Sequence, residues 1–292
     1  MSIVVEKVKS SKPKSRHMES IEPDFIQDSL SGISTGQEEP ILRIENLSIS
    51  FGSNPVLRNI DFSIFKGETV AIIGESGCGK TVLLKTLIGL HKPNTGRILF
   101  DNKDLNELSY FDLARIRTRY GFVFQQAALF DSMTIRENIA FSLVQHTNKS
   151  KKEINEIVER LVNEVGLSQQ VLDKKPAELS GGMRKRVGFA RALALEPELI
   201  LYDEPTTGLD PIMSDVIDEL MIAAQIRYNV TSIMVTHDMK SACKVAGRII
   251  MLYPFAKLAE TEPQIIFDGT PEEIKKSKTP QVQQFLGIKN TG

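Results

Sequence analysis

A glycine-rich octapeptide constrains this chain more than any other feature. It follows the pattern G-x-x-x-x-G-K-[ST] and consists of Gly74, Glu75, Ser76, Gly77, Cys78, Gly79, Lys80 and Thr81. The run 69–73 before it is apolar, which is typical of a buried strand, and the run 82–88 after it has the apolar spacing of a helix. The octapeptide is therefore expected at a strand-to-helix turn.

Such a turn is suited to bind phosphate. Main-chain N–H groups and the positive end of the helix dipole converge on an anion there, and glycine lets the main chain come within hydrogen-bonding distance of it. We expect Lys80 to reach the β- and γ-phosphates of a nucleotide and the Thr81 hydroxyl to ligate Mg²⁺. The alternative is a glycine turn that holds no ligand.

Composition narrows the class of protein. The 292 residues suffice for one or two domains, and 41% of hydrophobic residues suffice for a substantial core. A formal net charge of −1 gives no reason to expect binding to nucleic acid. Two cysteines, Cys78 and Cys243, cannot form a disulfide framework, which favours a reducing compartment.

The sequence also bears on location. No apolar stretch approaches the roughly eighteen uncharged residues of a membrane span, and residues 1–7 lack the apolar core of a signal peptide. We therefore expect a soluble, cytoplasmic chain. Residues 1–39 are rich in Lys, Ser, Glu and Pro and are expected to form a disordered tail. Its basic run 7–16 is interpreted as solvated, with contact to anionic lipid as the alternative.

The remaining pattern alternates strands with helices. It predicts strands over 41–44, 47–51, 59–64, 199–202 and 230–235, a turn over 52–55, and helices over 150–167 and 212–228. Gly166 is a stop signal for the first helix, and Asp210 with Pro211 is an N-cap and first-turn pair for the second. Strands separated by helices imply an α/β fold with a parallel sheet.

Two further segments have the chemistry of a nucleotide site. Asp203 and Glu204 end the strand predicted over 199–202, where an acid can hold Mg²⁺ through its water shell and the next can polarise an attacking water. Ser180-Gly181-Gly182 opens a predicted helix and is a second candidate anion site. The plainer alternatives are a surface turn for the acids and a capped helix start for the serine.

Together these segments resemble the signature of ABC-type ATPases. The resemblance runs from about residue 41 to 269, and its motifs occur in family order. They are a Walker A loop at Gly74–Thr81, a Q-loop at Gln125, a signature at Leu179–Met183, Walker B at Leu199–Glu204, a D-loop at Thr207–Asp210 and a switch histidine at His237.

The resemblance implies a P-loop NTPase of ABC type. This fold has a mainly parallel sheet with flanking helices, an N-terminal antiparallel β part and a helical subdomain that carries the signature. On this basis we place the ATP-binding domain at 40–270, its helical subdomain at about 125–190 and a C-terminal extension at 271–292. The implied ligands are ATP and Mg²⁺.

The family also implies a shared site. One ATP lies between the Walker A loop of one copy and Ser180, Gly181 and Gly182 of a second copy. Asp210 then links the two sites, and the Phe51 ring stacks on adenine. Gln125 contacts Mg²⁺ or the attacking water, and His237 bonds the γ-phosphate. The plainer readings are a strand-end polar group for Gln125, a structural histidine for His237 and a core aromatic for Phe51.

Two positions differ from the residues that are commonest in the family, and a third lies where the family varies. Met183 stands where many members have Gln, and Phe51 where many have Tyr. Met183 removes a polar contact near the signature and is expected to alter nucleotide affinity at most. Cys78 occupies a variable position and is expected to be a small filler.

The segment 125–141 is similar to the corresponding segment of Mla-type ATPases. That similarity implies an integral membrane permease and an MCE-type lipid-binding protein as partners, phospholipid as cargo, and a peripheral place on the inner face of the cytoplasmic membrane. Leu129, Phe130 and Met133 are then expected at the permease contact, with ordinary core packing as the alternative. Competing functions are an amino-acid importer ATPase, a non-transport ABC protein and a P-loop kinase.

Overall fold

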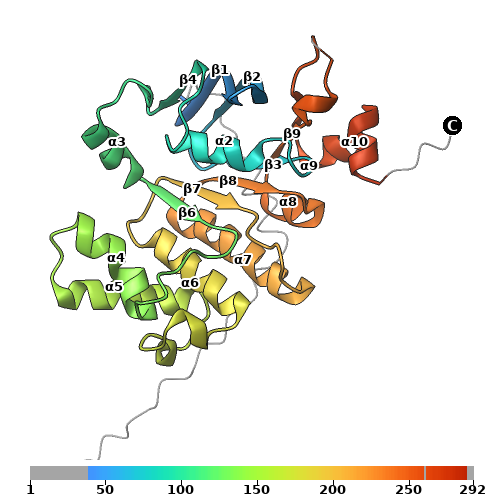
Figure 1. Cartoon of the computed structure of the whole chain (residues 1–292). Helices are drawn as coiled ribbons and strands as arrows, with labels where there is room; N and C mark the ends of the chain where they lie inside the picture. Colours follow the sequence, from blue (N-terminus) through green and yellow to red (C-terminus); the bar gives the residue numbers. More distant parts are fainter. Residues whose placement is uncertain (1–38, 260, 288–292) are drawn as a thin grey trace, which may run out of the picture. The chain divides into compact units, whose positions relative to one another are not determined.

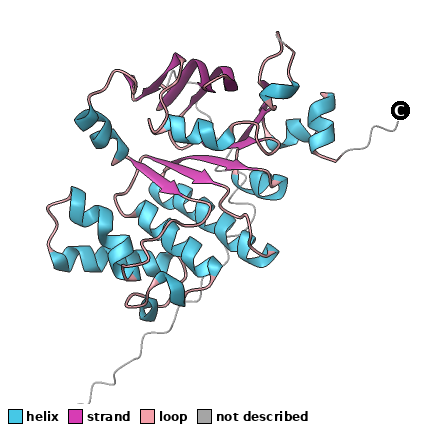
Figure 2. Cartoon of the chain, in the orientation of Figure 1, coloured by secondary structure: helices cyan, strands magenta, loops and turns pink. Residues whose placement is uncertain are grey.

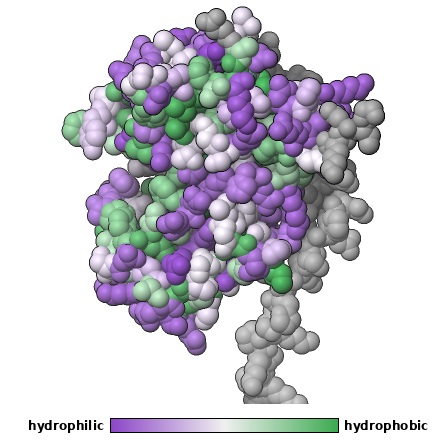
Figure 3. Space-filling model, turned by 45° about the vertical axis from the view of Figure 1, so that its right-hand side comes forward, coloured by the Kyte–Doolittle hydropathy of each residue, from purple (hydrophilic) through white to green (hydrophobic). Residues whose placement is uncertain are grey.

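The chain is described by a computed structural model over residues 39–259 and 261–287, which belong to one compact unit. The predicted tail lies outside the described residues except for its last residue. Two β-sheets and the helices around them make up the unit (Figures 1 and 2). No helix within the described ranges is long and apolar enough to cross a bilayer. The face in Figure 3 is a mosaic of hydrophilic and hydrophobic surface.

The smaller sheet is antiparallel and has the strand order β2-β1-β4-β5. Its strands are β1 (Leu42–Phe51), β2 (Asn54–Ile64), β4 (Thr95–Phe100) and β5 (Lys103–Asp104). The two short strands predicted over 41–44 and 47–51 are one strand, because β1 keeps its partners across a bulge at Asn46, whose φ is 48°.

The turn predicted over 52–55 is shorter than expected. Phe51 pairs with Asn54, so the turn holds only Gly52, with φ of 61°, and Ser53. Pro55 lies within β2 and pairs with Ser50. Proline is tolerated there because β2 is an edge strand of this sheet.

The larger sheet is mainly parallel and has the order β10-β9-β3-β8-β7-β6. Its strands are β3 (Thr69–Ile73), β6 (Tyr120–Val123), β7 (Leu199–Asp203), β8 (Thr231–Thr236), β9 (Arg248–Leu252) and β10 (Ile265–Gly269). β3, β7 and β8 are buried along their whole length, as expected for parallel strands covered on both faces. Only β10 runs antiparallel to its neighbour.

Alternate residues of these strands face two different cores. Val70 and Ile72 of β3 join a core with the antiparallel sheet and α2 (Lys80–Leu87), whereas Ala71 and Ile73 join a core with the large helices. The same alternation occurs in β7. The parallel sheet is thereby held between two apolar layers.

Helices cover both faces of the sheet. They are α2, α3 (Tyr110–Arg117), α4 (Ile135–His146), α5 (Lys151–Glu164), α6 (Gly181–Leu193), α7 (Pro211–Tyr228), α8 (Met239–Val245), α9 (Pro271–Lys275) and α10 (Pro280–Phe285), with 3₁₀ turns at Gln169–Val171, Pro176–Glu178 and Phe255–Lys257. The predicted helix over 150–167 is α5, which Ser150 caps and after which Gly166 has φ of 67°. Asp210 caps α7 as predicted.

This topology gathers four loops at one edge. β3, β8, β7 and β6 are consecutive neighbours and run parallel to one another. The segments that leave their carboxyl ends therefore lie side by side, which is where open α/β sheets bind ligands. Those segments begin at Gly74, His237, Glu204 and Phe124.

Candidate functional site

The phosphate loop (residues 74–81) connects β3 to α2, as predicted. Gly74, Gly77 and Gly79 have φ of 150°, 80° and 101°, a region that side chains disfavour. A Cβ on Gly74 would also overlap the carbonyl oxygen of Leu252 at the end of β9. The glycines are thus required by backbone conformation and, at Gly74, by close packing.

Lys80 holds the phosphate loop together from inside. Its side chain is buried, and Nζ donates to the carbonyl oxygens of Gly74 at 2.8 Å and Glu75 at 3.1 Å. A buried positive charge ringed by main-chain groups favours an anion beside it. Cys78 is also buried, and burial raises the pKa of its thiol, which fits a small filler.

The phosphate loop meets the end of β7 through Thr81. The Thr81 hydroxyl donates to Oδ1 of Asp203 over 3.0 Å. Burial raises the pKa of Asp203, and the bond from Thr81 lowers it in part. A hydroxyl and a carboxylate oxygen at this spacing are hard oxygen ligands of the kind that Mg²⁺ takes, so these two residues fit the ion.

Glu204 and His237 come together from two neighbouring strands. Nδ1 of His237 lies 2.8 Å from Oε2 of Glu204, which also accepts a bond from the Thr207 hydroxyl at 2.9 Å. Glu204 has φ of 49°, an unusual value for a residue with a side chain, and such conformations concentrate at functional sites. The carboxylate is therefore held in one place by its neighbours.

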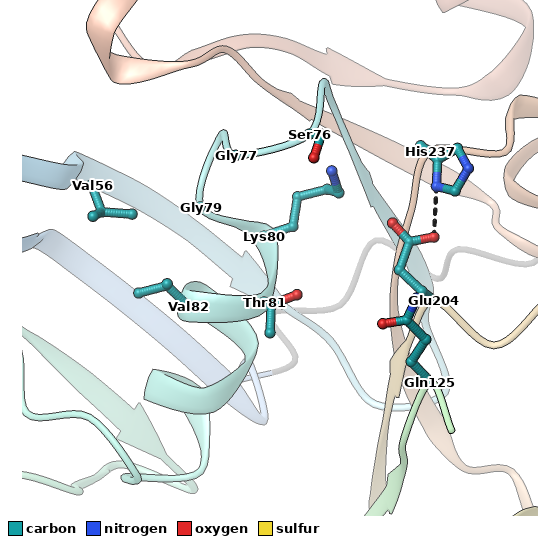
Figure 4. A pocket seen from close by; sticks show the side chains of 10 residues that line it. All are labelled: Val56, Ser76, Gly77, Gly79, Lys80, Thr81, Val82, Gln125, Glu204 and His237. Atoms are coloured by element: carbon teal, nitrogen blue, oxygen red, sulfur yellow. Dashed lines mark hydrogen bonds and ion pairs between the residues drawn. The ribbon is translucent and has the colours of Figure 1, made fainter. Parts of the chain in front are cut away.

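These groups surround one cavity of about 580 Å³, a size common for small-ligand sites. Its lining consists of Val56, Ser76, Gly77, Gly79, Lys80, Thr81, Val82, Gln125, Glu204 and His237. Figure 4 shows Gln125, Glu204 and His237 across the cavity from Lys80 and Ser76. Residues from five separate parts of the sequence thus face one space.

The remaining candidates lie elsewhere. Phe51, at the end of β1, is 47% exposed and places its ring edge-on to His91 with centroids 5.2 Å apart. The cavity lining does not include Phe51, the Ser180 turn or Asp210.

The signature turn (Leu179–Met183) begins α6 as predicted. The Ser180 hydroxyl caps the helix by accepting from the Met183 N–H. Gly182 packs against Met213, whose N–H donates to the Asp210 carboxylate. The turn and Asp210 are therefore neighbours of one another, away from the phosphate loop of the same chain.

Sequence reasoning missed three residues that shape the site. Val56 and Val82 supply apolar lining. Lys185 in α6 is buried and donates from Nζ to the carbonyl oxygens of Pro205 at 2.7 Å and Thr207 at 2.6 Å, and burial lowers its pKa. A sequence signal for Lys185 existed, since helical spacing places it on the apolar face with Gly182 and Phe189.

Comparison with known proteins agrees with this geometry. Residues 57–207 match the family described as ABC transporter. Among relatives, "Probable ribonucleotide transport ATP-binding protein mkl" of Mycobacterium leprae is 39% identical, over 86% of this chain and 70% of its own length. The intermembrane phospholipid transport system ATP-binding protein MlaF of Haemophilus influenzae is 36% identical, over 86% and 92%. The L-cystine import ATP-binding protein TcyC of Bacillus subtilis is 38% identical, over 84% and 97%.

Solved structures show the same fold. The ATP-binding cassette MJ0796, a dimer in a post-hydrolysis state with ADP and Pi, matches with a TM-score of 0.70 and 31% identity over 79% of this chain and 98% of its own. The cbiO1 subunit of the cbiONQ transporter complex from Clostridium perfringens matches with a TM-score of 0.73 and 30% identity over 87% and 96%. Fold, phosphate loop and relatives agree: the chain belongs to the ABC transporter family and is an ATP-binding, Mg²⁺-dependent ATPase subunit of a transporter.

Proposed function

We propose that two copies of this chain share each ATP. The observation that carries this proposal is the separation of the two anion sites, because the signature turn does not line the cavity that contains Lys80 and Glu204. The dimer of the related cassette MJ0796 supports it. In the proposed dimer, Ser180, Gly181 and Gly182 of one copy complete the cavity of the other, and Asp210 lies at the contact between the sites.

Within each site, Glu204 after β7 and His237 after β8 act at the γ-phosphate. Glu204 holds and polarises the attacking water. His237 keeps that carboxylate in place by donating from Nδ1, and when its other ring nitrogen also carries a proton it donates to the γ-phosphate. Lys80 neutralises charge on the β- and γ-phosphates. Thr81, Asp203 and Gln125 would hold Mg²⁺, which supplies electrostatic stabilisation of the phosphoryl oxygens. Phe51, together with Val56 and Val82 of the cavity lining, would contact the nucleoside.

The hydrolytic cycle is proposed to power a separate membrane permease. A groove of about 370 Å³ runs between the larger sheet and α4, and its lining includes the residue just before Gln125. The groove is lined by Tyr120, Gly121, Phe122, Phe124, Ala128, Phe130, Phe141, Ser142, Arg191, Ala192 and Leu195. Phe130 and Phe141 are exposed and lie with ring centroids 4.9 Å apart, with Arg191 against Phe130. An exposed aromatic pair in a groove is suited to hold an apolar helix of a partner.

Of the three positions expected at the permease contact, only Phe130 lines this groove. Leu129 is partly buried and packs against the hydrophobic core, which favours the plainer alternative for it. The sharpest test is therefore Phe130→Asp, which is expected to abolish co-purification with the permease. Phe111→Asp is a matched control, because Phe111 is exposed on α3 outside the groove. Equal recovery of the permease with both variants would contradict the groove as the docking site.

We propose phospholipid as the cargo and an MCE-type protein as a further partner. The similarity to MlaF, over 92% of that protein, supports this cargo. TcyC is similarly related and supports amino-acid import as the alternative. Affinity purification from native membranes, with mass spectrometry of proteins and lipids, separates the two. The expected result is a permease with an MCE-type protein and phospholipid; a permease with an amino-acid-binding protein would contradict it.

A further inference from the structure

The connection between β9 and β10 is far longer than the sheet requires. The strands are antiparallel neighbours in which Leu252 pairs with Ile265, a geometry that a two-residue turn can join. Twelve residues, 253–264, connect the two strands instead, and the structure describes 253–259 and 261–264 of them, which we call the strap (upper right in Figure 1). Its path leads to the phosphate loop.

Gln264, at the end of the strap, joins the phosphate loop to β2. The residue is 1% exposed, and both its amide oxygen and its amide nitrogen form hydrogen bonds within the protein. Oε1 accepts from the Arg58 N–H at 2.8 Å, while Nε2 donates to the carbonyl oxygens of Val56 at 2.9 Å and Cys78 at 3.2 Å. Val56 lines the cavity, and Cys78 belongs to the phosphate loop.

The bond to Cys78 has a geometric consequence for nucleotide binding. The Cys78 carbonyl and the Gly79 N–H belong to one planar trans peptide and point in opposite directions. When Gln264 holds the carbonyl, the Gly79 N–H is directed away from Gln264, and Gly79 lines the cavity. Gln264 therefore orients a main-chain donor of the kind that binds phosphate.

The strap makes a second contact with the phosphate loop through charge. Nζ of Lys257 forms an ion pair with the Glu75 carboxylate. Glu75 adds negative charge to a loop that binds a polyanion, and Lys257 offsets that charge. The hydrogen bond with Glu75 raises the pKa of Lys257, so the lysine stays charged at neutral pH.

An independent attachment keeps the strap in place. The Arg58 guanidinium donates to the carbonyl oxygens of Ala259 at 2.8 Å and Glu262 at 2.6 Å, and lies 4.9 Å from the Phe255 ring centre. The strap is thus fixed to β2 on one side and touches the phosphate loop on the other.

We propose that the strap supports the phosphate loop from outside, in addition to Lys80 within the loop, and that Gln264 is a positioning residue for ATP binding. Lys257 has the lesser role of neutralising Glu75. The proposal rests on ATP binding at the phosphate loop, and it is independent of the shared site and of the cargo. It concerns a segment that the strand pairing does not need and whose described residues reach the cavity through the phosphate loop and Val56.

The test measures the dissociation constant of a fluorescent ATP analogue with the purified full chain. Gln264→Leu keeps the size of the side chain and loses three hydrogen bonds, and Gln264→Glu keeps the acceptor for Arg58 and loses both donors. Both are expected to raise the dissociation constant and the KM for ATP about 10-fold, with a smaller change in kcat. Acidification should narrow the gap between Gln264→Glu and wild type, because a protonated carboxyl can donate to Cys78.

The ion pair is tested by a double-mutant cycle. Lys257→Met is expected to weaken ATP binding about 2- to 5-fold at low salt, and to have no effect when Glu75 is Gln. Lys66→Met is the matched control, since Lys66 is exposed and precedes the amino end of β3.

Binding within twofold of wild type by both folded Gln264 variants would overturn the proposal. A loss of ATP affinity in Gln264→Glu that is the same at every pH would also overturn it. The role of Lys257 would be overturned if Lys257→Met weakened ATP binding equally whether residue 75 is Glu or Gln. Lys80→Ala distinguishes failure of this proposal from failure of the proposed ATP site. If the phosphate loop did not bind ATP, Lys80→Ala would bind the analogue as tightly as wild type does.

Discussion

Nδ1 of His237 lies 2.8 Å from Oε2 of Glu204, although 33 residues separate them in the chain. The contact exists because β7 and β8 are parallel neighbours that end side by side. A histidine bonded in this way limits the rotation of the carboxylate and leaves the other ring nitrogen able to face the cavity. The tasks proposed for the two side chains can therefore be tested separately.

Glu204→Gln tests the task of the carboxylate. An amide cannot polarise the attacking water as a carboxylate does, so we expect hydrolysis to fall by about 10²–10³-fold. ATP binding should persist, and the variant should accumulate as an ATP-bound dimer. Phosphate release and light scattering measure the two effects, and rapid turnover by this variant would refute the assignment.

His237→Ala tests the task of the histidine. Loss of a donor to the γ-phosphate and of the bond to Glu204 should slow hydrolysis by about 10²-fold with little change in ATP affinity. His146→Ala is the control, because His146 is exposed at the end of α4. The assignment fails if the two alanine variants hydrolyse ATP at the same rate.

Thr81→Val tests the proposed metal ligands. The variant keeps the shape of threonine but loses the hydroxyl that bonds Asp203. We expect the Mg²⁺ concentration for half-maximal hydrolysis to rise about 10-fold, whereas nucleotide binding in EDTA stays unchanged. A Mg²⁺ titration that superimposes on that of wild type would exclude Thr81 as a ligand.

Asp218→Asn tests a buried acid outside the site. Burial raises the pKa of Asp218 from 3.8 to about 6, and a bond from the Ser241 hydroxyl opposes part of that rise. The folded chain therefore binds this proton more tightly than the unfolded chain, so this group makes stability fall as pH rises from about 4 to about 6. At pH 8 the asparagine variant should be more stable by about 1–3 kcal/mol.

The pH dependence provides the control for that prediction. Below about pH 3 the aspartate is protonated in both folded and unfolded chains, so the two proteins should unfold with similar free energies. Denaturant unfolding across the pH range measures the difference. A variant that is less stable than wild type at pH 8 would show that the buried charge is compensated within the fold.

Local patterns accounted for much of the fold. The phosphate loop, the caps at Ser150 and Asp210 and the stop at Gly166 depend on residues close together in sequence, so sequence alone could predict them. Two details of the antiparallel sheet were wrong, because pairing across the sheet carried β1 past Asn46 and started β2 at Asn54. Strand pairing is a long-range effect that a local pattern does not reveal.

The motif residues of the site were predictable from the sequence, but the residues that support them were not. Lys80, Thr81, Asp203, Glu204, Gln125 and His237 were recognisable from motifs, and the structure brings them together. Gln264 and Lys185 were not recognised, because each acts through bonds to main-chain carbonyls far away in sequence. A buried polar side chain becomes informative only when its partners are known.

The central claim is that one ATP is bound by the phosphate loop of one copy and the signature turn of another. Lys80→Ala disables the first element and Ser180→Arg the second, and each variant alone should be inactive. When equal amounts of the two purified variants pair at random, half of the dimers are mixed and each of these contains one intact site, so hydrolysis should recover to about a quarter of the wild-type rate. Full hydrolysis by Ser180→Arg alone, or no recovery in a mixture shown to contain mixed dimers, would contradict the account.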